Sequence, residues 1–411
     1  MAYARRFFGV IGVRFTAVAL VIGLCTGGMS SVPAVASVQT LAREAYLVDY
    51  ETGTVLYEKN GNIPMPPSSM SKLMTTVMVF ERLKEGSLSL DDRFSVSRNA
   101  WRKGGAASGG STMFLKPGST ASVEDLLYGV IVQSGNDACI VLAENLSGTE
   151  DAFAREMNAK AKGIGLSGSH FVNSTGLPDD GHVMTARDLA LLSRYIIHVY
   201  PEFYPMFSVT KFAHNGIRQQ NRNPLLYVPG QADGLKTGHT SVAGYGLTAS
   251  AEREGRRLIL VVNGLDSKKT RAAEAKKLMN WGFSQFENRT LFVAGVPVSQ
   301  ADVWLGQSEH VPLTVVHNVR VTLPRRALNR LDVRAVFTGP VPAPIAKGQH
   351  IGTLVVTAPG MHNSVDVPLV AAQDIARLGI WGRVYATIDH MLFGTPQRSD
   401  PPAVSLPSAE G

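Results

Sequence analysis

The sequence contains very little cysteine. With only Cys25 and Cys139 among 411 residues, the chain can build neither a disulfide scaffold nor a four-ligand zinc site based on cysteine. Histidines at a spacing typical of metal ligands are also lacking, and we expect no metal and no cofactor. Cys139 lies in an apolar stretch, so we expect it to behave as a small buried side chain.

Charged residues are few, at 18% of the chain against 45% hydrophobic residues, which is typical of a packed globular protein and excludes a disordered one. The net charge is +7, or +4 without the three arginines of the N-terminal segment, a modest excess that suits an anionic membrane surface or a cell wall. Basic clusters with interleaved aromatic residues are absent, so we expect no nucleic-acid partner. The length of 411 residues, at roughly 150 residues per domain, indicates two or three domains.

The N-terminal segment lacks an apolar run long enough to cross a membrane. Arg5, Arg6 and Arg14 make a positive start, and the apolar run 15–24 is shorter than the roughly 20 residues that a membrane span needs. Small residues at 34–36 then suit a signal peptidase. We therefore favour a cleaved signal peptide over residues 1–36, with a transmembrane anchor as the alternative, and expect an exported protein.

The C-terminal part predicts an amphipathic helix over 371–392, because apolar residues recur at helical spacing. The stripe consists of Ile375, Leu378, Trp381, Val384, Tyr385, Ile388, Met391 and Leu392. Such a helix can lie in a membrane interface with Trp381 at headgroup depth, or it can dock on its own domain, and the pattern leaves both readings open. Residues 393–411 include adjacent prolines and predict a disordered tail.

The middle of the chain divides into two parts. Residues 37–287 mix strand and helix patterns and predict an α+β domain. The expected elements are two strands over 44–59, helices over 69–85, 122–146 (interrupted at 134–136), 185–200 and 270–286, and a hairpin over 243–263. Short β-rich runs separated by glycine and proline then predict a small all-β domain over 288–370.

A possible nucleophile and its base stand three residues apart at a predicted helix start. Ser69 and Lys72 share one helix face, where exposed backbone N–H groups and the helix dipole favour an oxyanion. A serine hydroxyl needs an adjacent base, and lysine serves only when burial and a second cation keep it neutral. The alternative is a helix-capping serine followed by a solvated lysine. Ser-x-x-Lys recurs at 208–211 without a helix signal, so the string alone is weak evidence.

Two more strings could complete such a site. Ser134 and Asn136 offer a hydroxyl for proton relay and an amide for a substrate carbonyl, although an ordinary polar turn would read the same. Lys236 can be the second cation and Thr237 can hydrogen-bond a carboxylate.

Gly238 and His239 follow Thr237 on the same predicted strand and could contribute to substrate binding. Gly238 permits close approach of an extended peptide, and the backbone N–H of His239 can donate to an oxyanion.

The three strings together are Ser-x-x-Lys, Ser-x-Asn and Lys-Thr-Gly, in that order. With them, the chain resembles the low-molecular-mass penicillin-binding proteins, specifically the D-alanyl-D-alanine carboxypeptidases. The resemblance covers about residues 40–287 and includes the stretches 109–118, 170–182, 232–240 and 270–283. It implies a penicillin-recognising serine-enzyme domain, with an antiparallel sheet flanked by helices plus a helical subdomain, then the small all-β domain and a membrane-attaching helix.

The resemblance also implies a reaction and its residues. Terminal D-alanine would be removed from peptidoglycan stem peptides through an acyl-serine that water hydrolyses, at the periplasmic face of the inner membrane, and β-lactams would inhibit. The implied catalytic residues are Ser69, Lys72 and Ser134, and the implied substrate-binding residues are Asn136, Lys236, Thr237, Gly238, His239 and Arg271.

Three alternatives remain. A transpeptidase or endopeptidase would share the acylation step, and the three strings do not distinguish acceptors. A slow β-lactamase would share it too, but no Glu-x-x-x-Asn string lies between 137 and 235 for fast deacylation. A non-catalytic envelope-binding protein would have no physical need for the complete set.

Overall fold

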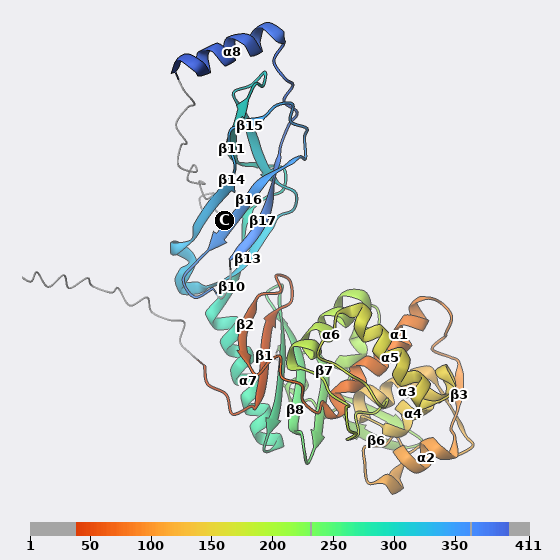
Figure 1. The fold of residues 1–411 in the computed structure, drawn as a ribbon. Helices are drawn as coiled ribbons and strands as arrows, with labels where there is room; N and C mark the ends of the chain where they lie inside the picture. Colours follow the sequence, from red (N-terminus) through yellow and green to blue (C-terminus); the bar gives the residue numbers. More distant parts are fainter. Residues whose placement is uncertain (1–37, 231, 362–363, 394–411) are drawn as a thin grey trace, which may run out of the picture. The chain divides into compact units, whose positions relative to one another are not determined.

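The computed structural model describes residues 38–230, 232–361 and 364–393. The predicted signal peptide and residues 394–411 of the predicted tail lie outside these residues. A five-stranded antiparallel sheet in the order β2-β1-β9-β8-β7 is central to the first domain (Figure 1). Its strands are β1 (Glu44–Asp49), β2 (Val55–Lys59), β7 (Gly234–Thr240), β8 (Gly244–Arg253) and β9 (Arg256–Leu265).

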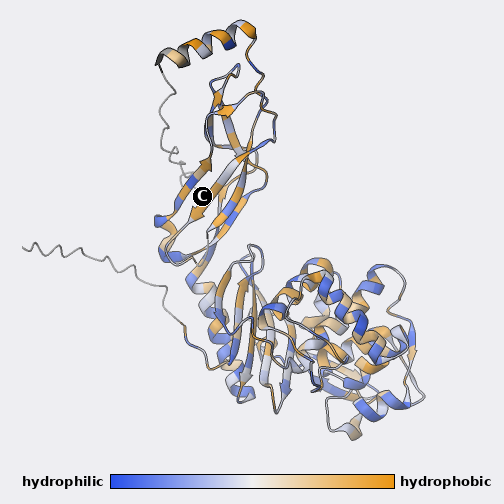
Figure 2. Cartoon of the chain, in the orientation of Figure 1, coloured by the Kyte–Doolittle hydropathy of each residue, from blue (hydrophilic) through white to orange (hydrophobic). Residues whose placement is uncertain are grey.

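The sheet is buried on both faces. Successive residues of a strand point to opposite faces, so they belong to two different cores. On β9, Leu258 and Leu260 belong to a core shared with α7 (Lys268–Gln285). Ile259 and Val261 belong instead to a larger core formed with the remaining helices of the domain. The central strand β9 accordingly has an unbroken apolar run over 258–262, and Figure 2 shows orange segments within the sheet.

The larger core contains the helices that carry two of the three motifs. The helices are α1 (Lys72–Lys84), α2 (Arg98–Gly104), α3 (Val123–Tyr128), α4 (Asn136–Ser147), α5 (Glu150–Ile164) and α6 (Ala186–Val199). Two small two-stranded antiparallel sheets accompany them: β3 (Arg93–Ser95) pairs with β4 (Thr120–Ser122), and β5 (Lys211–His214) forms a hairpin with β6 (Ile217–Gln220). The helix predicted over 69–85 is preceded by a 3₁₀ turn, η1 (Ser68–Ser71).

The second part of the chain is all-β and has its own core. Its strands are β10 (Phe286–Phe292), β11 (Pro297–Trp304), β12 (His310–Val315), β13 (Val319–Pro324), β14 (Asp332–Phe337), β15 (Val341–Pro342), β16 (His350–Thr357) and β17 (Val365–Ala371). One sheet has the order β14-β16-β17-β12-β11-β15, and β10 pairs with β13 separately. The side chains of Val311, Leu313, Leu354 and Leu369 are fully buried between these strands. An α+β domain followed by an all-β domain is the predicted fold class.

The C-terminal helix is shorter than the sequence predicted. α8 spans Ile380–Phe393, so the expectation of helix from residue 371 is wrong. Ile375, assigned to the apolar stripe, forms a β-bridge with Ile345 and is buried in the all-β core. Asp374 is likewise held there, because its carboxylate accepts a hydrogen bond from the Lys347 backbone N–H at 2.8 Å.

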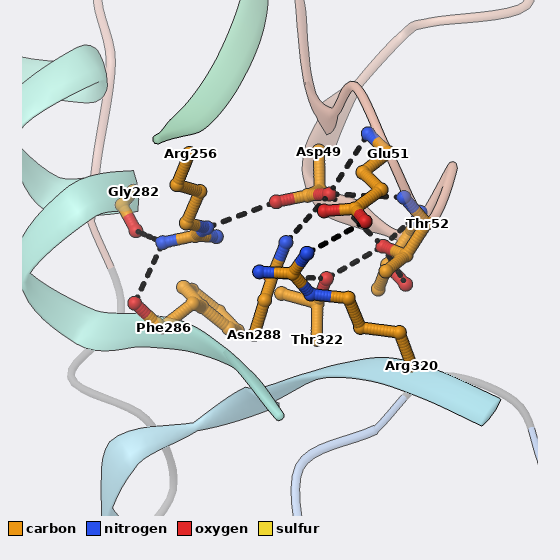
Figure 3. A network of polar contacts seen from close by, with 10 residues as sticks. Asp49, Glu51, Thr52, Arg256, Gly282, Phe286, Asn288, Arg320 and Thr322 are labelled. Atoms are coloured by element: carbon orange, nitrogen blue, oxygen red, sulfur yellow. Dashed lines mark hydrogen bonds and ion pairs between the residues drawn. The ribbon is translucent and has the colours of Figure 1, made fainter. Parts of the chain in front are cut away.

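A polar network connects the β1–β2 turn to α7 and to the all-β strands (Figure 3). The fully buried Asp49 carboxylate pairs with Arg256 at 2.9 Å and accepts from Asn288 at 3.2 Å. Arg256 also donates to the backbone oxygen of Phe286, where α7 gives way to β10. The Thr52 hydroxyl lies 2.5 Å from that of Thr322 on β13. The turn after β1 is therefore fixed by polar contacts to both parts of the chain.

Candidate active site

Ser69 lies on the 3₁₀ turn that leads into α1. The turn follows Pro67, and Ser68 has a positive φ of 51°, so the chain bends sharply before the helix. Met70 and Leu73 are fully buried and hold the turn against the core. The Ser69 side chain is only partly buried, which leaves the hydroxyl accessible at the start of the helix.

Lys72 is fully buried on the first turn of α1. Its Nζ lies 2.9 Å from Ser69 Oγ and 2.7 Å from Asn136 Oδ1. A third contact joins Nζ to the backbone oxygen of Thr175. The predicted base is therefore in hydrogen-bond contact with the predicted nucleophile and with the predicted amide, which comes from a different helix.

The second motif follows a π-helical turn, η3 (Gly129–Gln133), after α3. Ser134 then takes a left-handed conformation, with φ 60° and ψ 32°, and α4 begins at Asn136. A non-glycine residue in this region is uncommon and often marks a functional site. Ser134 is 1% exposed, and its Oγ has no hydrogen-bond partner among the described residues. The hydrogen-bonding capacity of that hydroxyl is therefore unused by the described residues.

The third motif lies on β7, beside the turn that carries Ser69. A Cβ at Gly238 would stand 2.9 Å from the backbone oxygen of Pro67 and 3.0 Å from the Cβ of Ser68. Glycine is thus required for this strand to approach the serine turn so closely. Lys236 and Thr237 precede it and are buried at 3% and 6% exposure.

Burial makes both motif lysines unusually acidic. Burial, with a smaller contribution from the charge of Arg222, lowers the pKa of Lys72 to about 8. Burial also lowers the pKa of Lys236 well below its ordinary value, with the charges of Lys72, Arg222 and Arg271 adding to the effect. The sequence predicted that Lys236 would lower the pKa of Lys72, but the second cation that acts on Lys72 is Arg222, whereas the charge of Lys72 lowers the pKa of Lys236. The result suits a neutral amine beside Ser69.

Arg271 lies on α7, and its guanidinium contacts the backbone of β8 and of Arg222. Its Nη2 donates to the Arg222 backbone oxygen at 3.1 Å, and Nη1 lies 3.5 Å from the Gly246 oxygen. Nε has no partner among the described residues. Burial lowers the pKa of Arg271 to about 10, so the side chain remains charged at neutral pH. Tyr245 stacks on the exposed His239 ring with centroids 3.9 Å apart, and the Arg271 guanidinium carbon lies 5.8 Å from the Tyr245 ring centroid.

Sequence reasoning missed three contributors. Thr175 acts through its backbone oxygen, which leaves no signature in the side-chain pattern. Arg222 lies outside every motif, and its charge reaches both motif lysines. Asp137 follows Asn136 directly, and its carboxylate accepts from the backbone N–H groups of Met113 and Leu115 at 2.8 and 3.0 Å. An acidic residue next to a motif could have been noticed, but its partners could not.

Comparisons with known proteins identify the family of the chain. Residues 31–267 match the family described as D-alanyl-D-alanine carboxypeptidase, and residues 286–377 match the C-terminal domain of penicillin-binding protein 5. The D-alanyl-D-alanine carboxypeptidase DacC of Escherichia coli is 40% identical over 86% of this chain and 90% of its own. The enzyme DacA of the same organism is 36% identical over 92% of this chain and 97% of its own. The structure of penicillin-binding protein 5 from Haemophilus influenzae superposes with a TM-score of 0.75 at 36% identity, covering 84% of this chain and all of that one.

The chain therefore belongs to the D-alanyl-D-alanine carboxypeptidase family, among the low-molecular-mass penicillin-binding proteins. The family and fold class predicted from the three motifs are confirmed, and the protein is a serine peptidase that acts as a carboxypeptidase. Among the described residues, no group of three or more His, Cys, Asp or Glu side chains could hold a metal ion.

Proposed function

We propose that this chain removes the terminal D-alanine from peptidoglycan stem peptides through an acyl-enzyme at Ser69. One observation carries the proposal. The Lys72 amine lies 2.9 Å from Ser69 Oγ in a buried environment that lowers its pKa to about 8. A neutral amine at hydrogen-bond distance is what a serine hydroxyl needs to become a nucleophile.

In the proposed acylation, Lys72 accepts the hydroxyl proton while Ser69 Oγ attacks the carbonyl carbon of the penultimate D-alanine. The C–N bond to the terminal D-alanine breaks, and the Ser134 hydroxyl relays the proton from the Lys72 ammonium to the leaving amine, so that Lys72 is neutral again before deacylation. The backbone N–H groups of Ser69 and His239 stabilise the oxyanion. The Asn136 amide, which already contacts Lys72, orients the substrate.

The terminal carboxylate of the substrate binds near two basic side chains and a hydroxyl group. Lys236, Thr237 and Arg271 receive it, and Gly238 lets the extended peptide lie along β7. The unpartnered Nε of Arg271 supports this role. Water then adds to the ester carbonyl, its proton passes to Lys72, and the shortened peptide leaves with the serine restored.

The test uses purified residues 37–411 and a pentapeptide that ends in D-Ala-D-Ala. Wild type should release D-alanine and form a covalent adduct with fluorescent penicillin, and Ser69→Ala should do neither. Ser208→Ala is the matched control, because it alters the other Ser-x-x-Lys string at 208–211. D-alanine release by Ser69→Ala, or none by wild type, would refute the proposal. Transfer of the acyl group to an added amine instead of water would favour the transpeptidase alternative.

We further propose that the protein is exported and attaches to the periplasmic face of the inner membrane through α8. No described helix is long and apolar enough to span a bilayer. α8 nevertheless exposes six apolar side chains, with Trp381 85% and Met391 80% exposed, and Figure 2 shows orange segments alternating with blue and pale ones along this helix. An amphipathic helix of this kind binds in the plane of a membrane interface.

Membrane attachment can be measured by flotation with vesicles that contain anionic lipid. Residues 37–411 should float with the vesicles, and a Trp381→Ser, Tyr385→Ser double variant should bind much less. Val316→Ser is the control, because Val316 is 55% exposed but lies between strands of the all-β part. Equal binding by all three proteins would contradict the proposal.

A further inference from the structure

The segment Asn173–Gly176 is folded tightly against the serine turn. The Asn173 side-chain oxygen accepts hydrogen bonds from the backbone N–H groups of Thr175 and Gly176, at 3.1 and 2.8 Å, and from the Thr175 hydroxyl. Gly176 has φ +73°, and a Cβ there would stand 2.0 Å from the Ser68 backbone oxygen. The segment therefore passes in direct contact with the turn that carries the nucleophile.

Two residues of α1 hold successive carbonyl groups of this segment. The Thr75 hydroxyl donates to the Ser174 oxygen at 2.6 Å, and Lys72 Nζ contacts the Thr175 oxygen. Thr75 stands one helical turn after Lys72, so both side chains lie on the same face of the helix. Lys72, Thr75, Ser174 and Thr175 are each 1% exposed or less.

The Thr175 carbonyl has a chemical consequence for Lys72. Two of the three Nζ contacts are to oxygens that cannot donate, the Thr175 carbonyl and the Asn136 amide oxygen. A neutral amine has two N–H groups and one lone pair. When the two N–H groups donate to these oxygens, the lone pair remains for the Ser69 hydroxyl, 2.9 Å away. The carbonyl thus helps to aim the base at the nucleophile.

Glu150 completes the arrangement from another helix. It is the first residue of α5, and its Oε1 accepts from both the backbone N–H and the hydroxyl of Ser174, at 3.1 and 2.6 Å. We propose that Glu150 is a positioning residue for acyl transfer, which clamps Ser174 so that the Thr175 carbonyl stays on Lys72 and the amine lone pair stays aimed at Ser69. This inference rests on the proposed function of Ser69 and Lys72.

Glu150 also favours α5 simply as an acid in its first turn, and the test must separate the two effects. Asp151 is the neighbouring acid in that turn and is exposed, so Asp151→Ala is a matched control. Glu150→Gln removes the charge and keeps an acceptor for Ser174. The charge of Glu150 raises the pKa of Lys72, as does that of Asp137. Charge removal alone therefore moves the acid limb of the rate profile to lower pH.

The other groups that act on Lys72 are unchanged in these variants. Arg222 lowers the pKa of Lys72 and Cys139 raises it, while the charge of Lys72 lowers the pKa of Lys236. A shift of the acid limb in Glu150→Gln can therefore be assigned to the lost charge of the carboxylate. A lower rate at the plateau, where Lys72 is fully neutral, is not explained by a change in the pKa of Lys72.

The experiment measures the second-order rate of acylation by fluorescent penicillin, from pH 6 to 10, on residues 37–411. Glu150→Ala should be slower at the plateau by about tenfold or more, because a charge-assisted hydrogen bond that positions the base is lost. Glu150→Gln and Asp151→Ala should stay within about threefold of wild type at the plateau. For D-alanine release, Glu150→Ala should lower kcat with little change in KM.

Two results would overturn the inference. One is a Glu150→Ala plateau rate within about threefold of wild type, and the other is an equal loss in Asp151→Ala. If Glu150→Ala does not fold, Ser174→Ala decides, since it removes the 2.6 Å contact and must then slow acylation. A wild-type chain that forms no adduct at Ser69 refutes the proposed function itself. A reactive wild type with unchanged Glu150 and Ser174 variants refutes only the clamp.

Discussion

The pH dependence of acylation tests the proposed base most directly. Burial lowers the pKa of Lys72 from 10.5 to about 8. At about 1.36 kcal/mol per pKa unit, this corresponds to about 3 kcal/mol against the charged form. At pH 7 the neutral fraction rises from about one in three thousand to about one in ten. Because only the neutral amine can accept the Ser69 proton, the rate should rise with pH through about 8 and then level off.

The assay is the second-order rate constant for reaction with fluorescent penicillin, corrected for hydrolysis of free penicillin. Arg222→Gln provides a signed perturbation, because the Arg222 charge lowers the pKa of Lys72. Its removal should move the acid limb to higher pH. A flat profile between pH 6 and 9 would show that the neutral Lys72 amine is not the base, and a limb near the ordinary lysine pKa would show that burial does not lower the pKa of Lys72. A limb that moves to lower pH in Arg222→Gln would contradict the electrostatic reasoning.

Three further predictions concern the scaffold of the site. Asp49→Ala should lower the free energy of unfolding by about 3 kcal/mol in urea denaturation, because it leaves the largely buried Arg256 without its carboxylate partner. Glu51→Gln, which removes the exposed ion pair between Glu51 and Arg320, should cost under about 1 kcal/mol. Cys139 should resist Ellman's reagent at pH 8 in the folded protein and react after denaturation, since burial raises the pKa of its thiol to about 12; fast labelling of folded protein would contradict this. Gly176→Ala should abolish the penicillin adduct, because its Cβ would stand 2.0 Å from a backbone oxygen, and Gly163→Ala, which has open space around it, should not.

Local patterns in the sequence were sufficient for most of the fold. The hairpin predicted over 243–263 is β8 and β9, and the helix predicted over 185–200 is α6. Both have a strong period and clear turn or cap residues, which depend on neighbours in sequence alone. The C-terminal helix failed for the opposite reason. Ile375 fits a helical stripe, but its pairing with Ile345 is a long-range contact that periodicity does not record.

The candidate site divides in a similar way. Side chains with a chemical signature, such as Ser69 and Lys72, could be named from the sequence because serine needs a base at a fixed spacing. The Thr175 carbonyl could not, since every residue has one and only the fold selects which one meets Lys72. Glu150 is still less visible, because it acts on Lys72 through Ser174 and Thr175.

Within the described part of the chain, the two motif lysines, Lys72 and Lys236, are buried without a carboxylate partner. Lys72 and Lys236 are 0% and 3% exposed, and neither has an ion pair with a carboxylate among the described residues. Buried charges are normally paired, because an unpaired one is costly. In the proposed mechanism the cost is reduced by proton loss at Lys72, which yields the base, and on substrate binding by the carboxylate that approaches Lys236. In that mechanism the same desolvation that destabilises the two charged lysines supplies both the base for Ser69 and the attraction for a peptide C-terminus.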